Sequence, residues 1–428
     1  MHNGANSIIL KGLREAREQT DQLLEMVHPE ALYDRPIAER HRLVFYVGHL
    51  EAFDWNMVCR RGLGLESFHP EFDQLFEFGI DPGPDDLPRD KASDWPALAH
   101  IDPYRVQTRD AVDRALESAD DLWTFSLALE HRLMHAETLA YLLHRLPHHK
   151  KVRKVAAVDY KREPAASSVE IPAGEATLGR RLQSRAQFGW DNEFSEEAVF
   201  TPAFSIDVHN VTNRQFLEFV LAGGYEQRSL WSAQAWDWVQ KNGIRHPNFW
   251  REVGGEWAYE TMFSTIPLPL SWPVYVSHAE AEAYASWRGK ALPTEAQYHR
   301  AAFGTSGEAE RAFPWGNSAP VADVHGNFDA IRWNPQPVGS YPAGDSFFGV
   351  ADLMSNGWEW TSTVFAPLRG FLPFPLYPGY SSNFFDGKHY VLKGASPRTA
   401  ANLLRRSFRN WFQPYYSNLY AKFRCVDN

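Results

Sequence analysis

Residues 122–146 read LWTFSLALEHRLMHAETLAYLLHRL, and this stretch decides the fold of the N-terminal part of the chain. It contains neither glycine nor proline, and its apolar residues recur at intervals of three and four, which predicts an α-helix. His131 and His135 are four positions apart, so their side chains lie on the same face. Mostly apolar residues share that face, which therefore points into protein: Thr124, Leu127, Ala128, Leu139 and Leu142.

Two imidazoles on a buried face must both find partners. A shared divalent metal ion would satisfy both, but separate hydrogen bonds within a core would satisfy them as well, so the spacing leaves both interpretations open. His144 and His148 are also four apart, but Pro147 between them ends the helix and excludes that pair.

Upstream segments also have helical patterns, and a Pro- and Asp-rich loop at 78–96 interrupts them. We expect three helices there, the second closed by glycine at its C-terminal end: 8–27, 38–62 (with Gly62 and Gly64) and 104–118. Together with the helix at 122–146, they predict a four-helix bundle for residues 1–150.

A third histidine belongs to the same inward surface. His49 shares one face of the second helix with Phe45, Tyr46 and Phe53. Bundles build metal sites from side chains on facing helices, so His49, His131 and His135 are candidate ligands of one three-histidine site. Zinc, iron and other divalent ions all accept imidazole, and a hydrogen-bonded core histidine remains the alternative for His49.

Length and composition bound the class of protein. A chain of 428 residues is long enough for two or three domains, and its 44% apolar and 22% charged residues are ordinary for a soluble protein. The net charge of −10 argues against a nucleic acid partner. Only two cysteines occur, Cys59 and Cys425, so no disulfide framework is expected. The N-terminal residues lack the apolar core of a signal peptide, and no stretch is apolar enough to span a membrane, which predicts a cytoplasmic protein without a membrane partner.

The texture of the sequence changes after residue 150. Residues 151–167 are charged and then small, as in a linker. Residues 168–428 alternate short β-branched runs with Gly, Pro, Asn and Asp clusters, which predicts a loop-rich α+β domain. Within it we expect helices at 213–222, 277–288 and 294–302, the last with Thr294 as its N-terminal cap.

Several phrases of this domain resemble the formylglycine-generating-enzyme, or sulfatase-modifying-factor, fold, a variant of the C-type lectin architecture. They occur in family order: IPAGEATLG (171–179), FGWDNE (188–193), VTNRQFLEFV (211–220), LPTEAQYHRAA (292–302), FPWGN (313–317), FGVADLMSNGWEWT (348–361) and RRSFRNW (405–411). Formylglycine-generating enzymes bind copper through a cysteine pair near the C-terminus. This chain has only Cys425 there, so that chemistry is not expected.

A DinB-like four-helix bundle followed by this domain resembles the ergothioneine sulfoxide synthase family and its relative, selenoneine synthase. The resemblance implies a non-haem iron(II) site and O2 as co-substrate. In the family, the residues of this site are one distant histidine and a His-x3-His-x-Glu motif. Here the motif reads HRLMHAE, with His131, His135 and Glu137, and the distant ligand is His49 in GHLE. Glu137 would then support the ligands from outside the coordination sphere.

The resemblance also implies small-molecule substrates. In the family, sulfur or selenium is joined to C2 of the imidazole of Nα-trimethylhistidine (hercynine), and Asn410 and Trp411 match the positions that hold this substrate. The trimethylammonium group cannot donate hydrogen bonds, so an aromatic wall suits it through cation–π attraction. Met134 stands where one branch of the family has a glutamine that contacts the imidazole.

The donor pocket departs from the branch that uses γ-glutamylcysteine. That branch has an acidic residue and an arginine where this chain has Phe412 and Tyr416, and neither can pair with an ammonium or a carboxylate. An aromatic pocket that also carries Gln413 suits an uncharged, ring-shaped donor, the selenosugar of selenoneine synthase. The alternative is an ergothioneine sulfoxide synthase that uses cysteine.

The family also uses a tyrosine as proton donor near the iron. The run 376–385 offers Tyr377 and Tyr380, and Tyr104 of the helical part is a third candidate. Two alternative functions are also compatible with these residues. One is a DinB-type thiol transferase with zinc or nickel on the same histidines, and the other is a binding protein whose helical part is only structural.

Overall fold

The computed structural model describes residues 2–79, 87–152, 158, 164–181, 188–307 and 309–427. The chain forms two compact units, Met1–Val155 with Gln183–Phe188, and Ala156–Leu182 with Gly189–Asn428. Most of the predicted linker, at 153–157 and 159–163, lies outside the described residues. Within the described residues, no helix combines the length and the apolarity that crossing a membrane requires.

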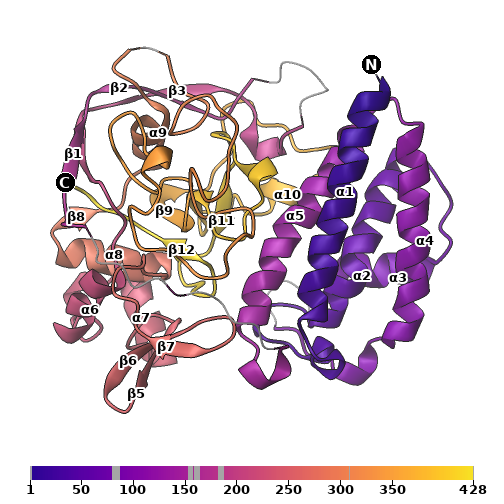
Figure 1. Ribbon diagram of the computed structural model, residues 1–428, viewed down its shortest axis with the longest axis horizontal. Helices are drawn as coiled ribbons and strands as arrows, with labels where there is room; N and C mark the ends of the chain where they lie inside the picture. The colour runs from indigo at the N-terminus through magenta and orange to yellow at the C-terminus, as the bar shows by residue number, and fades with distance from the viewer. Residues whose placement is uncertain are drawn as a thin grey trace. The chain divides into compact units, whose positions relative to one another are not determined.

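The first unit is helical, and its helices are coloured indigo to magenta in Figure 1. It contains α1 (His2–Glu25), α2 (Leu43–Asp54), α3 (Pro70–Phe78), α4 (Leu98–Glu117) and α5 (Trp123–His144). Helix α1 packs against α5, and α2 packs against α3, α4 and α5. One apolar cluster joins α1, α4, α5 and the π-helical turn that follows α2: Leu13, Trp55, Val58, Cys59, Val112, Leu116, Phe125 and Ala128.

The helix predicted at 122–146 is confirmed as α5, and α1 begins six residues earlier than the 8–27 expected. The second helix begins at Leu43 instead of residue 38 and continues into a π-helix, η2 (Trp55–Gly62). At the observed start, the backbone N–H of Leu43 donates to the carbonyl of Asp34 at 3.1 Å, and Arg42 binds the buried carboxylate of Asp90. A helix that began at residue 38 would instead direct the Leu43 N–H to the carbonyl of residue 39.

Two further differences concern the middle of the first unit. Helix α4 begins at Leu98 and includes Pro103, whereas proline suggested a start at 104. The carbonyl that Pro103 leaves without a donor belongs to Ala99, which is exposed, so water can satisfy it. Helix α3 was not expected, although Pro70 at its first position and acidic residues in its first turn are the usual signals.

The second unit combines small sheets with short helices. Its strands are β1 (Ser168–Ile171), β2 (Gly174–Leu178), β3 (Glu197–Thr201), β4 (Phe204–Asp207), β5 (Trp250–Val253), β6 (Glu256–Glu260), β7 (Thr265–Pro267), β8 (Lys290–Ala291), β9 (Gly357–Val364), β10 (Tyr390–Ala395), β11 (Asn410–Phe412), β12 (Ala421–Lys422) and β13 (Val426–Asp427). They form sheets in the orders β1-β4-β13-β8, β11-β10-β9-β12, β2-β3 and β5-β6-β7. In the second of these sheets, Trp411 of β11 lies opposite Val391 of β10.

The described part of this unit has five α-helices, and side-chain caps begin the first four of them: α6 (Asn213–Leu221), α7 (Ala233–Asn242), α8 (His278–Trp287), α9 (Glu295–Phe303) and α10 (Gly379–Ser382). Helices α6, α8 and α9 match the predictions to within about one residue, because Thr212, Ser277 and Thr294 each form a capping box. Helix α7 was not expected. Ser232 caps its start and Gly243 ends it in the left-handed conformation, with φ of 62°, so both signals were present in the sequence.

Candidate functional site

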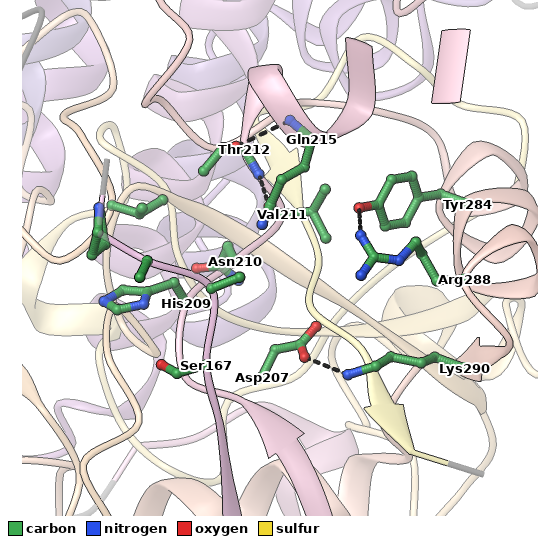
Figure 2. Close-up of a pocket in the computed structure, with 14 residues that line it drawn as sticks. Ser167, Asp207, His209, Asn210, Val211, Thr212, Gln215, Tyr284, Arg288 and Lys290 are labelled. Atoms are coloured by element: carbon green, nitrogen blue, oxygen red, sulfur yellow. Dashed lines mark hydrogen bonds and ion pairs between the residues drawn. The ribbon is translucent and has the colours of Figure 1, made fainter. Parts of the chain in front are cut away.

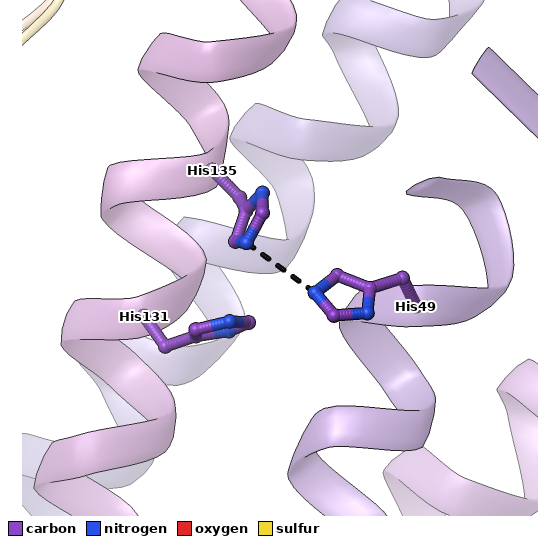
Figure 3. A group of neighbouring side chains, drawn as sticks. All are labelled: His49, His131 and His135. Atoms are coloured by element: carbon purple, nitrogen blue, oxygen red, sulfur yellow. Dashed lines mark hydrogen bonds between the residues drawn. The ribbon is translucent and has the colours of Figure 1, made fainter. Parts of the chain in front are cut away.

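The three predicted histidines come together in the first unit. His49 of α2 faces His131 and His135 of α5, as Figure 3 shows, and one nitrogen of each lies within 4.8 Å of the others. The Nε2 atoms of His49 and His135 are 3.3 Å apart. One turn of α5 separates His131 from His135, and their ring centroids are 4.4 Å apart. This is the convergent arrangement that the helical spacing predicted.

The surrounding packing fixes the orientation of His49. Its Nδ1 lies 2.7 Å from the carbonyl oxygen of Phe76, and only an N–H can be shared with a carbonyl. The other nitrogen, Nε2, therefore keeps its lone pair and points toward the two histidines of α5. Gly48 allows α3 to approach this closely, because a Cβ there would lie 2.4 Å from the ring of Phe76. Phe53 stacks on His131 with ring centroids 3.4 Å apart.

The electrostatics favour neutral imidazoles. Burial lowers the pKa of His49 to about 4, and it lowers the pKa values of His131 and His135 well below the usual value. Within the described residues, the Nδ1 atoms of His131 and His135 are buried without a hydrogen-bond partner. Three neutral imidazoles with converging nitrogens, one buried and two half-buried, have the chemistry of a site for a divalent transition metal.

A group of buried charges lies beside the histidines and was missed from the sequence. Arg132, which follows His131, contacts Glu51 and Asp54 of α2, with NH2–oxygen distances of 2.9 and 2.7 Å. Burial by itself raises the pKa of Glu51, but Arg132 and Arg109 outweigh it and lower that pKa to about 2. Burial dominates at Asp54 and raises its pKa. The sequence does show opposite charges at inward positions of the two helices. Which of them pair depends on how the helices align with each other, and the sequence does not specify that alignment.

Trp411, predicted to bind substrate, lies in one aromatic cluster with Tyr377 and Tyr380, predicted as proton donors. Trp411 of β11 stacks on Phe365, with ring centroids 4.3 Å apart and planes 5° apart. Tyr380 of α10 meets Trp411 edge to face, with centroids 5.3 Å apart, and Tyr377 lies 5.7 Å from Tyr380. Trp411 is only half-buried. The side chain of Asn410 accepts a hydrogen bond from the backbone N–H of Trp411 at 2.9 Å.

The predicted donor pocket contains two stacked rings. Phe412 and Tyr416 are half-buried, with centroids 5.1 Å apart and planes 20° apart. Gln413, between them in the sequence, is exposed. Its backbone carbonyl oxygen accepts a hydrogen bond from the backbone N–H of Tyr416 at 3.1 Å. The surface that this pair presents is aromatic and carries no formal charge.

The remaining predicted residues belong to the first unit. Tyr104 is buried on α4 and donates its hydroxyl hydrogen to Asp73 at 2.8 Å. Burial raises the pKa of Tyr104, and the carboxylate of Asp73 raises it further. Met134 is half-buried on α5, and Glu137 is buried on the same helix, two residues after His135.

A separate small cavity of about 50 Å³ lies in the second unit, where Figure 2 shows its lining. Lys290 binds Asp207 at 2.7 Å, and Arg288 reaches the hydroxyl of Tyr284 at 3.4 Å. The residues predicted for metal or substrate binding are not among those that line it. Its size suits a water molecule or a small ion, not an amino-acid derivative.

Comparisons with known proteins find a matching family and several relatives in sequence. Residues 154–428 match the family described as Sulfatase-modifying factor enzyme 1-like domain. The chain is 35% identical to the hercynine oxygenase of Mycolicibacterium thermoresistibile over 83% of this chain and 80% of that protein. It is 25% identical to ergothioneine biosynthesis protein 1 of Neurospora crassa over 94% of this chain, which spans about half of that protein (55%). Among solved structures, PvdO from Pseudomonas aeruginosa is 19% identical, with a TM-score of 0.39, over 62% of this chain and 98% of PvdO.

The fold and these matches define a protein with a sulfatase-modifying-factor domain preceded by a helical unit. The chain belongs to the ergothioneine sulfoxide synthase family, together with the hercynine oxygenases, and is an oxygenase-type enzyme.

Proposed function

We propose that this chain uses iron(II) and O2 to join selenium or sulfur to C2 of the imidazole of Nα-trimethylhistidine. The observation that carries the proposal is the convergence of His49, His131 and His135 in a relative of the hercynine oxygenases. Those relatives act, by their printed name, on hercynine, which is Nα-trimethylhistidine.

The three histidines suit a catalytic metal because each offers one nitrogen at one point. Replacing a C–H bond by a C–Se or C–S bond is an oxidation, and iron(II) bound there would supply the redox chemistry with O2 that zinc lacks. Three protein ligands leave open positions on a six-coordinate ion. Phe76 contributes by holding the tautomer of His49 that a metal requires. We assign Glu137, buried on α5 two residues after His135, to orient the ligands from outside the coordination sphere.

The aromatic cluster of the second unit supplies the recognition of trimethylhistidine. A trimethylammonium group is large, cationic and unable to donate hydrogen bonds, so it binds best to aromatic faces. Trp411 and Tyr380 are both half-buried, and the exposed parts of their rings, which meet at an interplanar angle of 82°, form such an aromatic surface. Asn410, next to Trp411, supplies a polar side chain for the rest of the substrate.

The donor is assigned from the stacked pair of Phe412 and Tyr416. An aromatic surface without charge favours a ring-shaped neutral donor over one with an ammonium and two carboxylates. We therefore place a selenosugar ahead of cysteine and γ-glutamylcysteine. Tyr377 and Tyr380 are the preferred proton donors on the family resemblance, and Tyr104, which donates its hydroxyl hydrogen to Asp73, is the alternative.

A competition experiment tests the proposal. The protein is reconstituted with iron(II) without oxygen and then given O2 and trimethylhistidine with equal amounts of selenosugar, cysteine and γ-glutamylcysteine. We expect a selenium-bearing imidazole as the main product and none without O2. A sulfoxide formed mainly from cysteine would overturn the donor assignment and leave the iron-dependent reaction intact. Full activity with zinc or nickel in the absence of O2 would overturn the oxygenase proposal itself.

A further inference from the structure

The proposed function gives no role to residues 190–193, Trp-Asp-Asn-Glu, which lie within one of the family-like motifs. They form the start and body of a short 3-10 helix, η5 (Asp191–Glu193), in the second unit. All four side chains are at most 1% exposed, although two of them are carboxylates. Buried carboxylates are costly unless they are paired, so their partners identify what this segment holds in place.

One set of partners lies on α10, the four-residue helix that carries Tyr380. The ring of Trp190 stacks on that of Tyr380, with centroids 3.9 Å apart and planes 23° apart. The hydroxyl of Ser381 donates to a carboxylate oxygen of Asp191 and accepts from the side chain of Asn192 at 2.9 Å. A helix this short cannot hold its own position, so these contacts fix where Tyr380 lies.

The other set of partners precedes β11, the strand that carries Trp411. Glu193 accepts hydrogen bonds from Arg405 at 2.5 and 2.7 Å and from the hydroxyl of Ser407 at 2.6 Å. The backbone N–H of Trp190 also donates to the Glu193 carboxylate, at 2.8 Å, so the two ends of the segment are joined. The chain from Ser407 reaches Trp411 four residues later.

The two segments held in this way meet at Tyr380 and Trp411, whose rings are in edge-to-face contact. We propose that residues 190–193 are a positioning element that sets Tyr380 against Trp411 and so fixes the width of the aromatic surface that receives the trimethylammonium group. This inference rests on the proposed function for its substrate. The geometry itself rests only on contacts within the second unit.

Two serine variants test the two sets of contacts separately, those with α10 and those with the segment before β11. Ser381→Ala removes the hydrogen bonds to Asp191 and Asn192, and Ser407→Ala removes one hydrogen bond to Glu193. Both serines are at most 2% exposed, and alanine adds no atoms that could disturb packing. Ser277→Ala is the matched control, because Ser277 is also fully buried and donates to a buried carboxylate, that of Glu280, at 2.7 Å.

The first measurement is amide hydrogen exchange of the full-length protein. We expect exchange in 376–385 to rise about tenfold in Ser381→Ala, and exchange in 405–412 to rise about tenfold in Ser407→Ala, as loss of a buried hydrogen bond predicts. Ser277→Ala should change neither segment by more than about twofold. If both segments exchange as in the wild type in both variants, the positioning role is wrong.

The second measurement is steady-state turnover of trimethylhistidine by the iron-loaded protein. Ser407→Ala should raise KM about fivefold with kcat within about twofold, because it loosens Trp411, which binds substrate. Ser381→Ala should raise KM and, in addition, lower kcat by about fivefold, because it loosens α10, the helix that carries Tyr380. Equal losses in the control variant would overturn the proposal, since a general loss of stability would then explain all three.

The two proposals can fail separately. A wild-type protein that does not turn over trimethylhistidine, combined with the expected exchange in the serine variants, would refute the proposed substrate and retain the positioning element. Normal turnover with unchanged exchange would refute the positioning element alone.

Discussion

Arg132 of α5 reaches across to Glu51 of α2, with its NH2 atom 2.9 Å from Oε2 and both side chains at most 1% exposed. The same NH2 atom donates to the backbone carbonyl of Leu50 at 3.0 Å. Arg132 follows His131 in the sequence, and Leu50 follows His49. The pair therefore ties together the backbones of the two helices that carry the candidate metal ligands.

This relationship predicts that Arg132→Met weakens both folding and metal binding. Removing the guanidinium leaves Glu51 and Asp54 buried without their main partner, which costs about 3–5 kcal/mol in the free energy of unfolding. The dissociation constant for iron(II) should rise about tenfold or more, as for other residues that orient metal ligands. Denaturant unfolding and metal titration check the two effects. Arg14→Met, at a largely exposed ion pair with Asp113, should change stability by less than about 1 kcal/mol.

The metal centre predicts a sharp contrast between two histidines of α5. His135→Ala should abolish stoichiometric iron binding, because it removes one of three converging nitrogens. His144→Ala, at the end of the same helix, should retain full metal content. Metal analysis after reconstitution and desalting distinguishes them. Retention of one iron per chain in His135→Ala would show that these histidines do not bind the metal.

The donor pocket predicts that specificity can be moved by charge. Phe412→Asp combined with Tyr416→Arg places an acidic residue and an arginine at the two positions where the γ-glutamylcysteine-using branch has them. We expect turnover with γ-glutamylcysteine relative to selenosugar to rise about tenfold, since each new ion pair contributes on the order of 1 kcal/mol. Competition between the two donors measures the ratio. Phe412→Leu with Tyr416→Leu is the control, which removes the rings without adding charge and should not raise that ratio.

The candidate proton donors predict different outcomes for three tyrosines. Tyr104→Phe should reduce stability by about 1 kcal/mol, through loss of the bond to Asp73, and leave kcat within about twofold. Tyr377→Phe or Tyr380→Phe should lower the yield of the C–Se or C–S product relative to O2 consumed. The ratio of product to O2, measured in the same assay, identifies the donor. If only Tyr104→Phe changes this ratio, the assignment to the second unit is wrong.

The lowered pKa of the buried Glu193 carboxyl group predicts that its contribution to the free energy of unfolding depends on pH. Burial by itself raises its pKa, but Arg405 and Arg180 outweigh burial and lower that pKa from the usual 4.5 to about 2. A carboxyl group with a lowered folded-state pKa stabilises the protein fully above about pH 4.5 and loses this contribution as the pH falls toward 2. The wild type should therefore exceed Glu193→Gln by about 3 kcal/mol at pH 7, and the difference should shrink below pH 4.5. Urea unfolding across this pH range measures it.

Local signals in the sequence were sufficient for several elements. The capping boxes at Thr212, Ser277 and Thr294 located three helices to within about one residue, because a cap is a contact between near neighbours. The spacing of His131 and His135 likewise placed both on one face of α5. Helix α2 begins later than expected, at Leu43, next to Arg42, which binds Asp90 in a contact between residues far apart in the chain.

Sequence patterns alone were enough to find the helical character of the first region, the helix that carries two of the histidines, and the family motifs of the second region with their order. The helices could be found in this way because helical periodicity and capping depend on residues at most four positions apart. Only the tertiary structure decided that Arg132 pairs with Glu51, that Phe76 sets the tautomer of His49, and that residues 190–193 join Tyr380 to Trp411. These contacts connect residues 27 to 214 positions apart, and no local pattern specifies which of many buried polar groups will meet.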